Sequence, residues 1–133
     1  MTPEIAELER APLFATLTLA ELEHLRVRLE VEPFGVGQVL LHEGRHGYAF
    51  YLLREGEADV TIDGRVVGHL RRNDFFGEMA ILGDGHRAAT VTATSPGLAW
   101  CMFGTTFREL ERDHPEIAST INELAADRLV AHG

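Results

Sequence analysis

The chain has 133 residues and a formal net charge of −9, and all 12 of its basic residues are arginines. This length suits one domain with its own core, and an acidic surface without a basic stripe argues against nucleic acid as a partner of this chain alone. No apolar run approaches the roughly 18 residues of a membrane span, and the polar N-terminus does not resemble a signal peptide. The absence of lysine excludes a P-loop nucleoside triphosphatase. We therefore expect a cytoplasmic domain, and its single cysteine, Cys101, is compatible with a reducing compartment.

Residues 1–35 predict a helical lead-in. Thr18 and Glu21 have the spacing of a capping box, in which a hydroxyl and a carboxylate accept the free N–H groups at a helix start. Three leucines then share one helical face: Leu22, Leu25 and Leu29. Pro33 and Gly35 are expected to end this helix.

Residues 36–104 predict a β-roll. Glycines separate six short runs rich in β-prone side chains, at 38–41, 48–53, 58–62, 65–70, 89–93 and 98–103. Asp63-Gly64 between two of these runs is a strong signal for a two-residue hairpin turn. Many short strands with frequent turns are typical of a sandwich or a barrel.

Residues 105–133 predict helices again. Thr106 and Glu109 have the spacing of a second capping box, and Pro115 suits the first turn of a last helix that reaches about Ala131. Residues at helical spacing follow along that helix: Ile117, Ile121, Leu124 and Arg128. We therefore interpret residues 1–133 as a single domain in which helices flank a β-roll.

The segment HEGRH, residues 42–46, matches the H-E-x-x-H motif of zinc proteases. That motif must lie on a helix, so that both imidazoles face one zinc ion. Gly44 lies inside it and Gly47 follows it, and each glycine costs a helix interior ~1 kcal/mol. Because the flanking runs predict strands, we interpret the segment as a polar turn with exposed histidines and expect no metal site.

The stretch FGEMAILGDGHRAATV, residues 76–91, carries the chemistry of an anion site. Gly77 lets the backbone approach a ligand closely, and a one-turn helix over 78–82 would present free N–H groups to an anion. Arg87 offers a guanidinium fork to a phosphate, while Glu78 suits a ribose hydroxyl. One phosphate charge and a free 2′-hydroxyl describe a cyclic mononucleotide, although Glu78 and Arg87 would also suit a simple ion pair across a loop.

This stretch closely resembles the phosphate-binding cassette of the cyclic nucleotide-binding domain family, F-G-E-x-A-(L/I) followed by R-x-A-(T/S)-V. The family includes bacterial catabolite activators, regulatory subunits of protein kinase A and cyclic nucleotide-gated channels. The resemblance implies that Glu78 binds the ribose 2′-hydroxyl and that Arg87 binds the cyclic phosphate. It also implies a cradle of backbone amides around Gly77, Met79, Ala80, Ala88 and Ala89. Ala88 stands where a hydroxyl residue often favours cGMP in the family, so cAMP is the expected ligand.

The resemblance further implies a fold and a mode of action. The fold would be a mostly β, double-stranded β-helix (jelly-roll-like) β-roll with N-terminal helices and C-terminal lid helices. The chain would be a non-catalytic cAMP sensor whose last helix closes over the purine, where Arg128 is long enough to stack on the base. Because the chain ends at Gly133 without a helix-turn-helix domain, we expect a sensor that acts on a protein effector or as a homodimer. Two alternatives stay open, a degenerate sensor that binds no nucleotide and a cupin-like metal enzyme.

Overall fold

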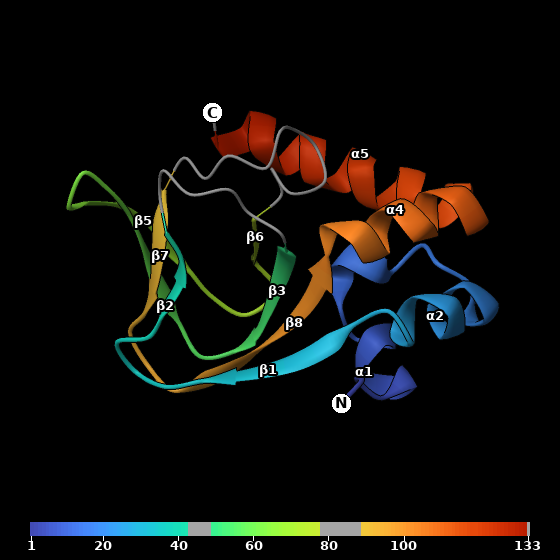
Figure 1. Ribbon diagram of the computed structural model, residues 1–133, viewed down its shortest axis with the longest axis horizontal. Coiled ribbons are helices and arrows are strands. Elements are labelled where there is room, and N and C mark those ends of the chain that lie inside the picture. The colour runs from blue at the N-terminus through green and yellow to red at the C-terminus, as the bar shows by residue number, and fades with distance from the viewer. Residues whose placement is uncertain (43–48, 78–88, 133) are drawn as a thin grey trace.

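In the computed structural model, two antiparallel sheets form a β-roll, and helices from both ends of the chain pack beside it (Figure 1). The structure describes residues 1–42, 49–77 and 89–132, and of residues 124–132 it describes the backbone alone. No helix in these ranges is long and apolar enough to cross a membrane. The predicted fold class, a mostly β roll with flanking helices, is confirmed.

The helices lie at the two ends of the chain, and the strands lie between them. The helical elements are α1 (Ile5–Glu9), the 3-10 helix η1 (Pro12–Phe14), α2 (Leu19–Arg26), α4 (Gly104–Asp113) and α5 (Pro115–His132). The strands are β1 (Glu30–Phe34), β2 (Val39–Leu41), β3 (Ala49–Glu55), β4 (Ala58–Ile62), β5 (Arg65–Leu70), β6 (Phe75–Phe76), β7 (Thr90–Ala93) and β8 (Gly97–Phe103).

The strands form two four-stranded sheets. Sheet A has the order β1-β8-β3-β6, and sheet B has the order β2-β7-β4-β5. The predicted hairpin between β4 and β5 is confirmed, because Asp63 and Gly64 both have positive φ, 50° and 79°. Two central residues with positive φ define a turn whose twist matches that of the flanking strands.

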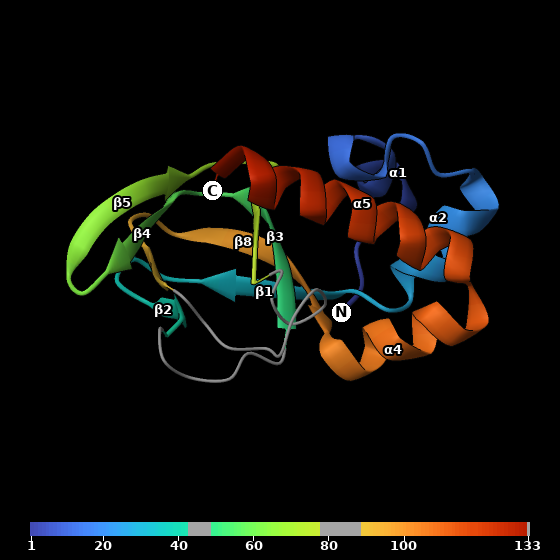
Figure 2. The same ribbon diagram turned by 90° about the horizontal axis from the view of Figure 1, so that it is seen from above.

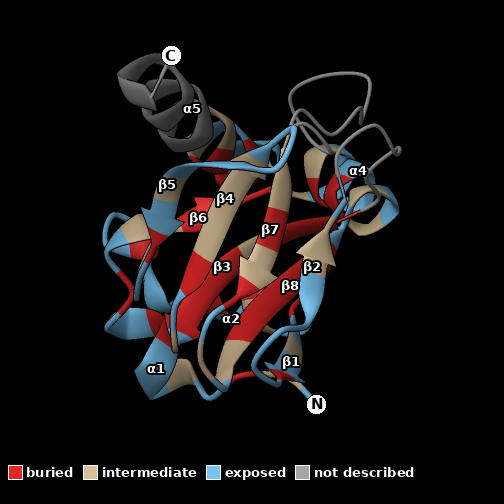
Figure 3. Cartoon of the chain, turned by 90° about the vertical axis from the view of Figure 1, so that its left-hand side faces the viewer, coloured by how far each residue is buried: buried red, intermediate tan, exposed pale blue. Residues whose placement is uncertain are grey.

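Sheet A is buried on both faces, and this creates two cores. The inner core lies between the sheets and contains Phe34, Leu53, Ala58, Leu70, Phe76, Val91, Ala93 and Ala99. The outer core lies between sheet A and the helices, and includes Leu8, Phe14, Leu25, Phe50, Leu52, Phe75, Trp100, Met102, Phe107, Leu110, Ile117 and Ile121. In Figure 3, which faces sheet B, buried residues follow β3 and β8 behind it. Cys101 is buried on β8, between two residues of the outer core.

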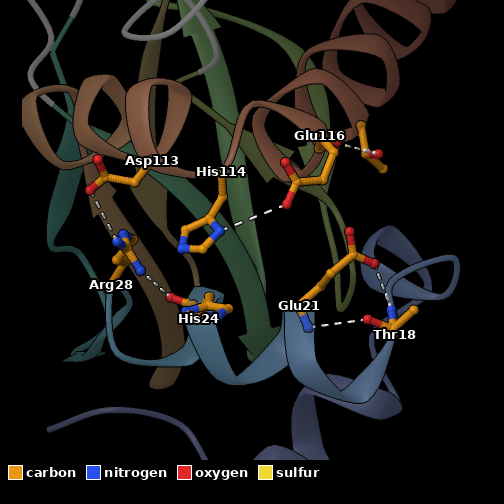
Figure 4. Close-up of polar contacts among 8 residues, drawn as sticks. Thr18, Glu21, His24, Arg28, Asp113, His114 and Glu116 are labelled. Atoms are coloured by element: carbon orange, nitrogen blue, oxygen red, sulfur yellow. Dashed lines mark hydrogen bonds and ion pairs between the residues drawn. The ribbon is translucent and has the colours of Figure 1, made fainter.

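The predicted extent of the first long helix is wrong. Its capping box is confirmed, since Thr18 Oγ1 accepts from Glu21 N at 3.2 Å and Glu21 Oε1 accepts from Thr18 N at 2.9 Å (Figure 4). The helix ends at Arg26, however, and Leu29 is buried from a turn that follows it. Pro33 then lies in β1, where an edge strand tolerates a residue without an N–H group.

The second predicted capping box is also wrong. Helix α4 begins at Gly104, directly after β8, and its N-cap residue Phe103 makes no side-chain cap hydrogen bond. Thr106 therefore lies within the first turn of α4. Burial of Phe107 and Leu110, both 0% exposed, sets the position of this helix, since each of them packs in the outer core.

Polar and ring contacts join α2 to the turn between α4 and α5 (Figure 4). The rings of His24 and His114 lie 4.0 Å apart between centroids. Arg28 Nη1 donates to the His24 carbonyl oxygen at 2.6 Å, and Arg28 Nη2 lies 3.7 Å from Asp113 Oδ2. These contacts attach the base of α5 to the N-terminal helices.

Candidate functional site

The predicted cassette, residues 76–91, connects the two sheets. It begins on β6 of sheet A and ends on β7 of sheet B. Of the predicted site residues, the structure describes Gly77 and Ala89 and the backbone of Arg128. The others lie outside the described residues: Glu78, Met79, Ala80, Arg87 and Ala88. The geometry of the site is therefore defined by the segments that flank it.

Strand β6 anchors the start of the cassette in both cores. Phe75 packs in the outer core, with its ring centroid 5.5 Å from that of Phe50. Phe76 packs in the inner core and stacks on Tyr51, with centroids 5.0 Å apart and an interplanar angle of 10°. Successive side chains of a strand point to opposite faces, so two residues suffice to hold β6 from both sides.

Gly77 follows this anchor with a φ of +79°. A side chain is disfavoured in this conformation, whereas glycine adopts it readily. The glycine of the F-G-E motif is therefore required by the direction in which the chain leaves β6.

Strand β7 anchors the other end of the cassette. Val91 is 2% exposed in the inner core, and its register partners are Leu41 on β2 and Val60 on β4. The half-buried Ala89 precedes this strand. The cassette thus starts and ends on rigid strands, which is a common way to position a binding loop.

The segment HEGRH starts at the same end of the roll. Strand β2 ends at Leu41, beside Val91 at the beginning of β7. Of this segment the structure describes His42, because residues 43–48 lie outside the described residues. Its neighbours β2 and β3 are strands, as predicted. Within the described ranges, no group of three acidic, histidine or cysteine residues is placed to hold a metal ion.

Helix α5 confirms the predicted last helix and extends over the roll. It runs from the helical side of the molecule to the side of the β-roll in both views (Figures 1 and 2). Its described buried side chains lie in the first two turns: Ile117, Ala118 and Ile121. The side chains of Leu124 and Arg128 lie outside the described residues.

Sequence reasoning missed a buried arginine beside the turn that leads into β6. Arg54 on β3 is 4% exposed, and its Nη1 donates to Asn73 Oδ1 in the turn before β6. Burial lowers the pKa of the Arg54 guanidinium from its ordinary value, and the positive charge of Arg72 lowers it further. The detectable signal was a charge in the apolar run FYLLRE, on the same face as Phe50 and Leu52.

Comparison with known proteins identifies the family. The model of the cyclic nucleotide-binding domain matches residues 31–114, which include both anchoring strands and the cassette. The chain therefore belongs to the cyclic nucleotide-binding domain family.

Three relatives show the range of similarity. A cAMP-dependent protein kinase regulatory subunit of Hypocrea atroviridis is 43% identical over 88 residues, which cover 66% of this chain and 19% of the relative. A cGMP-dependent protein kinase of Toxoplasma gondii is 42% identical over 80 residues, covering 60% of this chain and 8% of the relative. The chain thus spans less than a quarter of the length of either protein. The crystal structure of a protein from Geobacter metallireducens GS-15 has the same fold, with a TM-score of 0.87, 21% identity and coverage of 98% of both chains.

The conformation of Gly77 gives a testable prediction. In Gly77→Ala, a side chain at φ +79° is expected to lower the free energy of unfolding by ~1–2 kcal/mol. The matched control is Gly35→Ala, because Gly35 does not have a positive φ and a Cβ there meets nothing within 4 Å. Urea unfolding measures both variants. Equal stability of the two variants would show that the chain leaves β6 without need of a glycine.

Proposed function

We propose that this chain is a non-catalytic sensor domain that binds cAMP in the cassette, residues 76–91. The observation that carries the proposal is the family's complete cassette motif, located between two strands that are anchored in different sheets. Both ends of the binding loop are then held in place before a ligand arrives, and pre-organisation of this kind lowers the cost of binding.

Each proposed role follows from side-chain chemistry. Arg87 binds the cyclic phosphate, because its guanidinium pairs with two phosphate oxygens at once. Glu78 accepts from the ribose 2′-hydroxyl, so its carboxylate would face the ribose and not the phosphate. Backbone amides complete the cradle around the phosphate, contributed by Gly77, Met79, Ala80, Ala88 and Ala89. The positive φ of Gly77 supports this arrangement, since it turns the backbone where the cradle begins.

The choice of cAMP rests on Ala88. The relatives include both a cAMP-dependent and a cGMP-dependent protein, so family membership is compatible with either nucleotide. Alanine has no hydroxyl to offer the guanine amino group, and a lost hydrogen bond of this kind costs ~0.5–1.5 kcal/mol. That difference favours adenine over guanine.

We propose α5 as the element that transmits the signal. Its first two turns are packed in the outer core, while its C-terminal part extends toward the roll (Figure 1). Closure of this part over the purine, with Arg128 stacked on the base, would bind the liganded state more tightly than the empty one. In its closed position, α5 would then act on a protein effector or on a second copy of the chain. We place this action in the cytoplasm.

Removal of the proposed phosphate ligand tests the site. Arg87→Ala deletes a charged hydrogen bond worth ~1.5–3 kcal/mol, so the affinity for cAMP is expected to fall at least ~tenfold. Isothermal titration measures the change. Arg10→Ala is the matched control, because Arg10 is exposed at the end of α1 and is not part of the cassette. A titration curve of Arg87→Ala that matches that of the parent chain would contradict the assignment.

Amide exchange tests the lid. Addition of cAMP is expected to slow exchange within residues 115–131, because closure protects amides that open locally in the empty state. Exchange in α2 serves as the internal control and is expected to stay the same. If exchange of α5 is identical with and without cAMP in a chain that binds it, the helix is structural and another element carries the signal.

A further inference from the structure

Among the described residues, Arg54 is the single charged side chain that is buried. It lies on the helix-facing side of β3, next to the outer core formed by Phe50, Leu52 and Trp100. Within the described ranges its guanidinium makes no direct ion pair, although the charges of Glu7 and Glu55 act on it and partly offset the effect of burial on its pKa. A buried charge that is not directly paired is costly, so this position needs a reason for its arginine.

Two contacts hold the guanidinium. Its Cζ lies 4.6 Å from the centroid of the Trp100 ring, whose plane is stacked on Phe14. Its Nη1 donates to Asn73 Oδ1. Arg54 Nε and Trp100 Nε1 are both buried without a hydrogen-bond partner in the described structure. The bond to Asn73 is thus the specific polar contact at the end of this side chain.

Asn73 belongs to the approach turn, residues 71–74, which leads into β6. Its φ is +76°, a left-handed conformation that is uncommon for residues other than glycine, although asparagine adopts it more readily than most. Main-chain hydrogen bonds tie this turn to β3 in both directions, because Asn73 N donates to Leu53 O and Leu53 N donates to Asp74 O, each at 2.8 Å. The turn is also closed on itself, since Arg71 N donates to Asp74 Oδ2 at 2.9 Å.

The approach turn determines how the chain enters the cassette. Phe75 and Phe76 follow it directly, and Gly77 comes next. A change in the backbone at Asn73 would therefore rotate β6 and displace the first amides of the cassette. An apolar residue of similar size at position 54 would avoid burial of a charge. Proteins with such a replacement are often at least as stable as those with the buried ionic group. Stability alone therefore does not explain Arg54.

We propose that Arg54 is a positioning residue for the nucleotide site. By its hydrogen bond it holds Asn73 in the left-handed conformation, and through the approach turn it sets the direction of β6 and of Gly77. This inference rests on the proposed function, because the affinity that it controls is that of the cassette for cAMP. It also connects the helical layer to the cassette, since the same guanidinium lies against Trp100 in the outer core.

The first test separates positioning from stability. Arg54→Met keeps the length and burial of the side chain and removes the donor to Asn73. We expect a melting temperature within a few degrees of that of the parent chain and a loss of cAMP affinity of ~threefold to thirtyfold. Gly64→Ala is the matched control, because a side chain at φ 79° strains the β4–β5 turn outside the outer core, and we expect it to lower the melting temperature and leave affinity unchanged. Loss of affinity in proportion to stability in both variants would overturn the proposal.

Variants of Asn73 test the same hydrogen bond if Arg54→Met does not fold. Asn73→Asp keeps an acceptor for Arg54, so we expect affinity for cAMP to be retained. Asn73→Ala removes the acceptor and does not favour the positive φ, so we expect at least the loss seen in Arg54→Met, with no further loss when Arg54→Met is added to it. Equal affinity of the two Asn73 variants would contradict a role for the bond.

Amide exchange without nucleotide separates this proposal from the proposed function. If the parent chain does not bind cAMP, the proposed function fails, but the Asn73 and Leu53 amides still report on the approach turn. In Arg54→Met we expect these two amides to exchange faster, with exchange of the Ala93 amide in sheet B unchanged. Exchange of the Asn73 and Leu53 amides at the parent rate would overturn the positioning role whether or not nucleotide binds.

Discussion

Burial of sheet A on both faces determines where the cassette begins. Strand β6 has only two residues, and one of them packs in the outer core while the other packs in the inner core. Full burial of a phenylalanine contributes roughly 1.5–3 kcal/mol, so the pair holds a strand that is too short to be fixed by its ladder bonds. Gly77 and the cassette start from this anchor, and a binding loop that starts from a rigid strand keeps its amides in place.

The outer core also connects the site to the helices. Phe75 on β6 shares this core with Phe107 and Leu110 of α4 and with Ile117 of α5. A closely packed core transmits small shifts instead of absorbing them. Events at the cassette and at the base of α5 can therefore be coupled without direct contact between them, and coupling free energies between sites are typically 1–3 kcal/mol.

Strands β2 to β5, β7 and β8 could be predicted from the sequence because their signals are local, whereas β1 lies within the predicted helical lead-in, residues 1–35, and the two-residue β6 was not predicted. Asp63-Gly64 favours one turn type, and this turn sets the register of β4 and β5. The extent of α2 could not be predicted, because Leu29 continues the helical periodicity although a turn buries it and Pro33 enters an edge strand. At Leu29 and at Pro33, tertiary packing outweighed the local pattern that predicted a longer helix.

The candidate site could be predicted in part. The spacing of the cassette motif indicates the residues that would meet the ligand, since those residues are contiguous in sequence. The support behind them is not contiguous, because Arg54 and Asn73 are 19 positions apart and meet only when β3 pairs beside the approach turn. A buried charge in an apolar strand signals such support, but it does not identify its partner.

We propose that this chain binds one cAMP molecule in the cassette. Isothermal titration of the unmodified chain with cAMP, and separately with cGMP, tests it most directly. The expected result is one nucleotide per chain with tighter binding of cAMP than of cGMP, by up to ~tenfold for one hydrogen bond. Absence of binding by either nucleotide would contradict the sensor function, and tighter binding of cGMP would contradict the inference from Ala88.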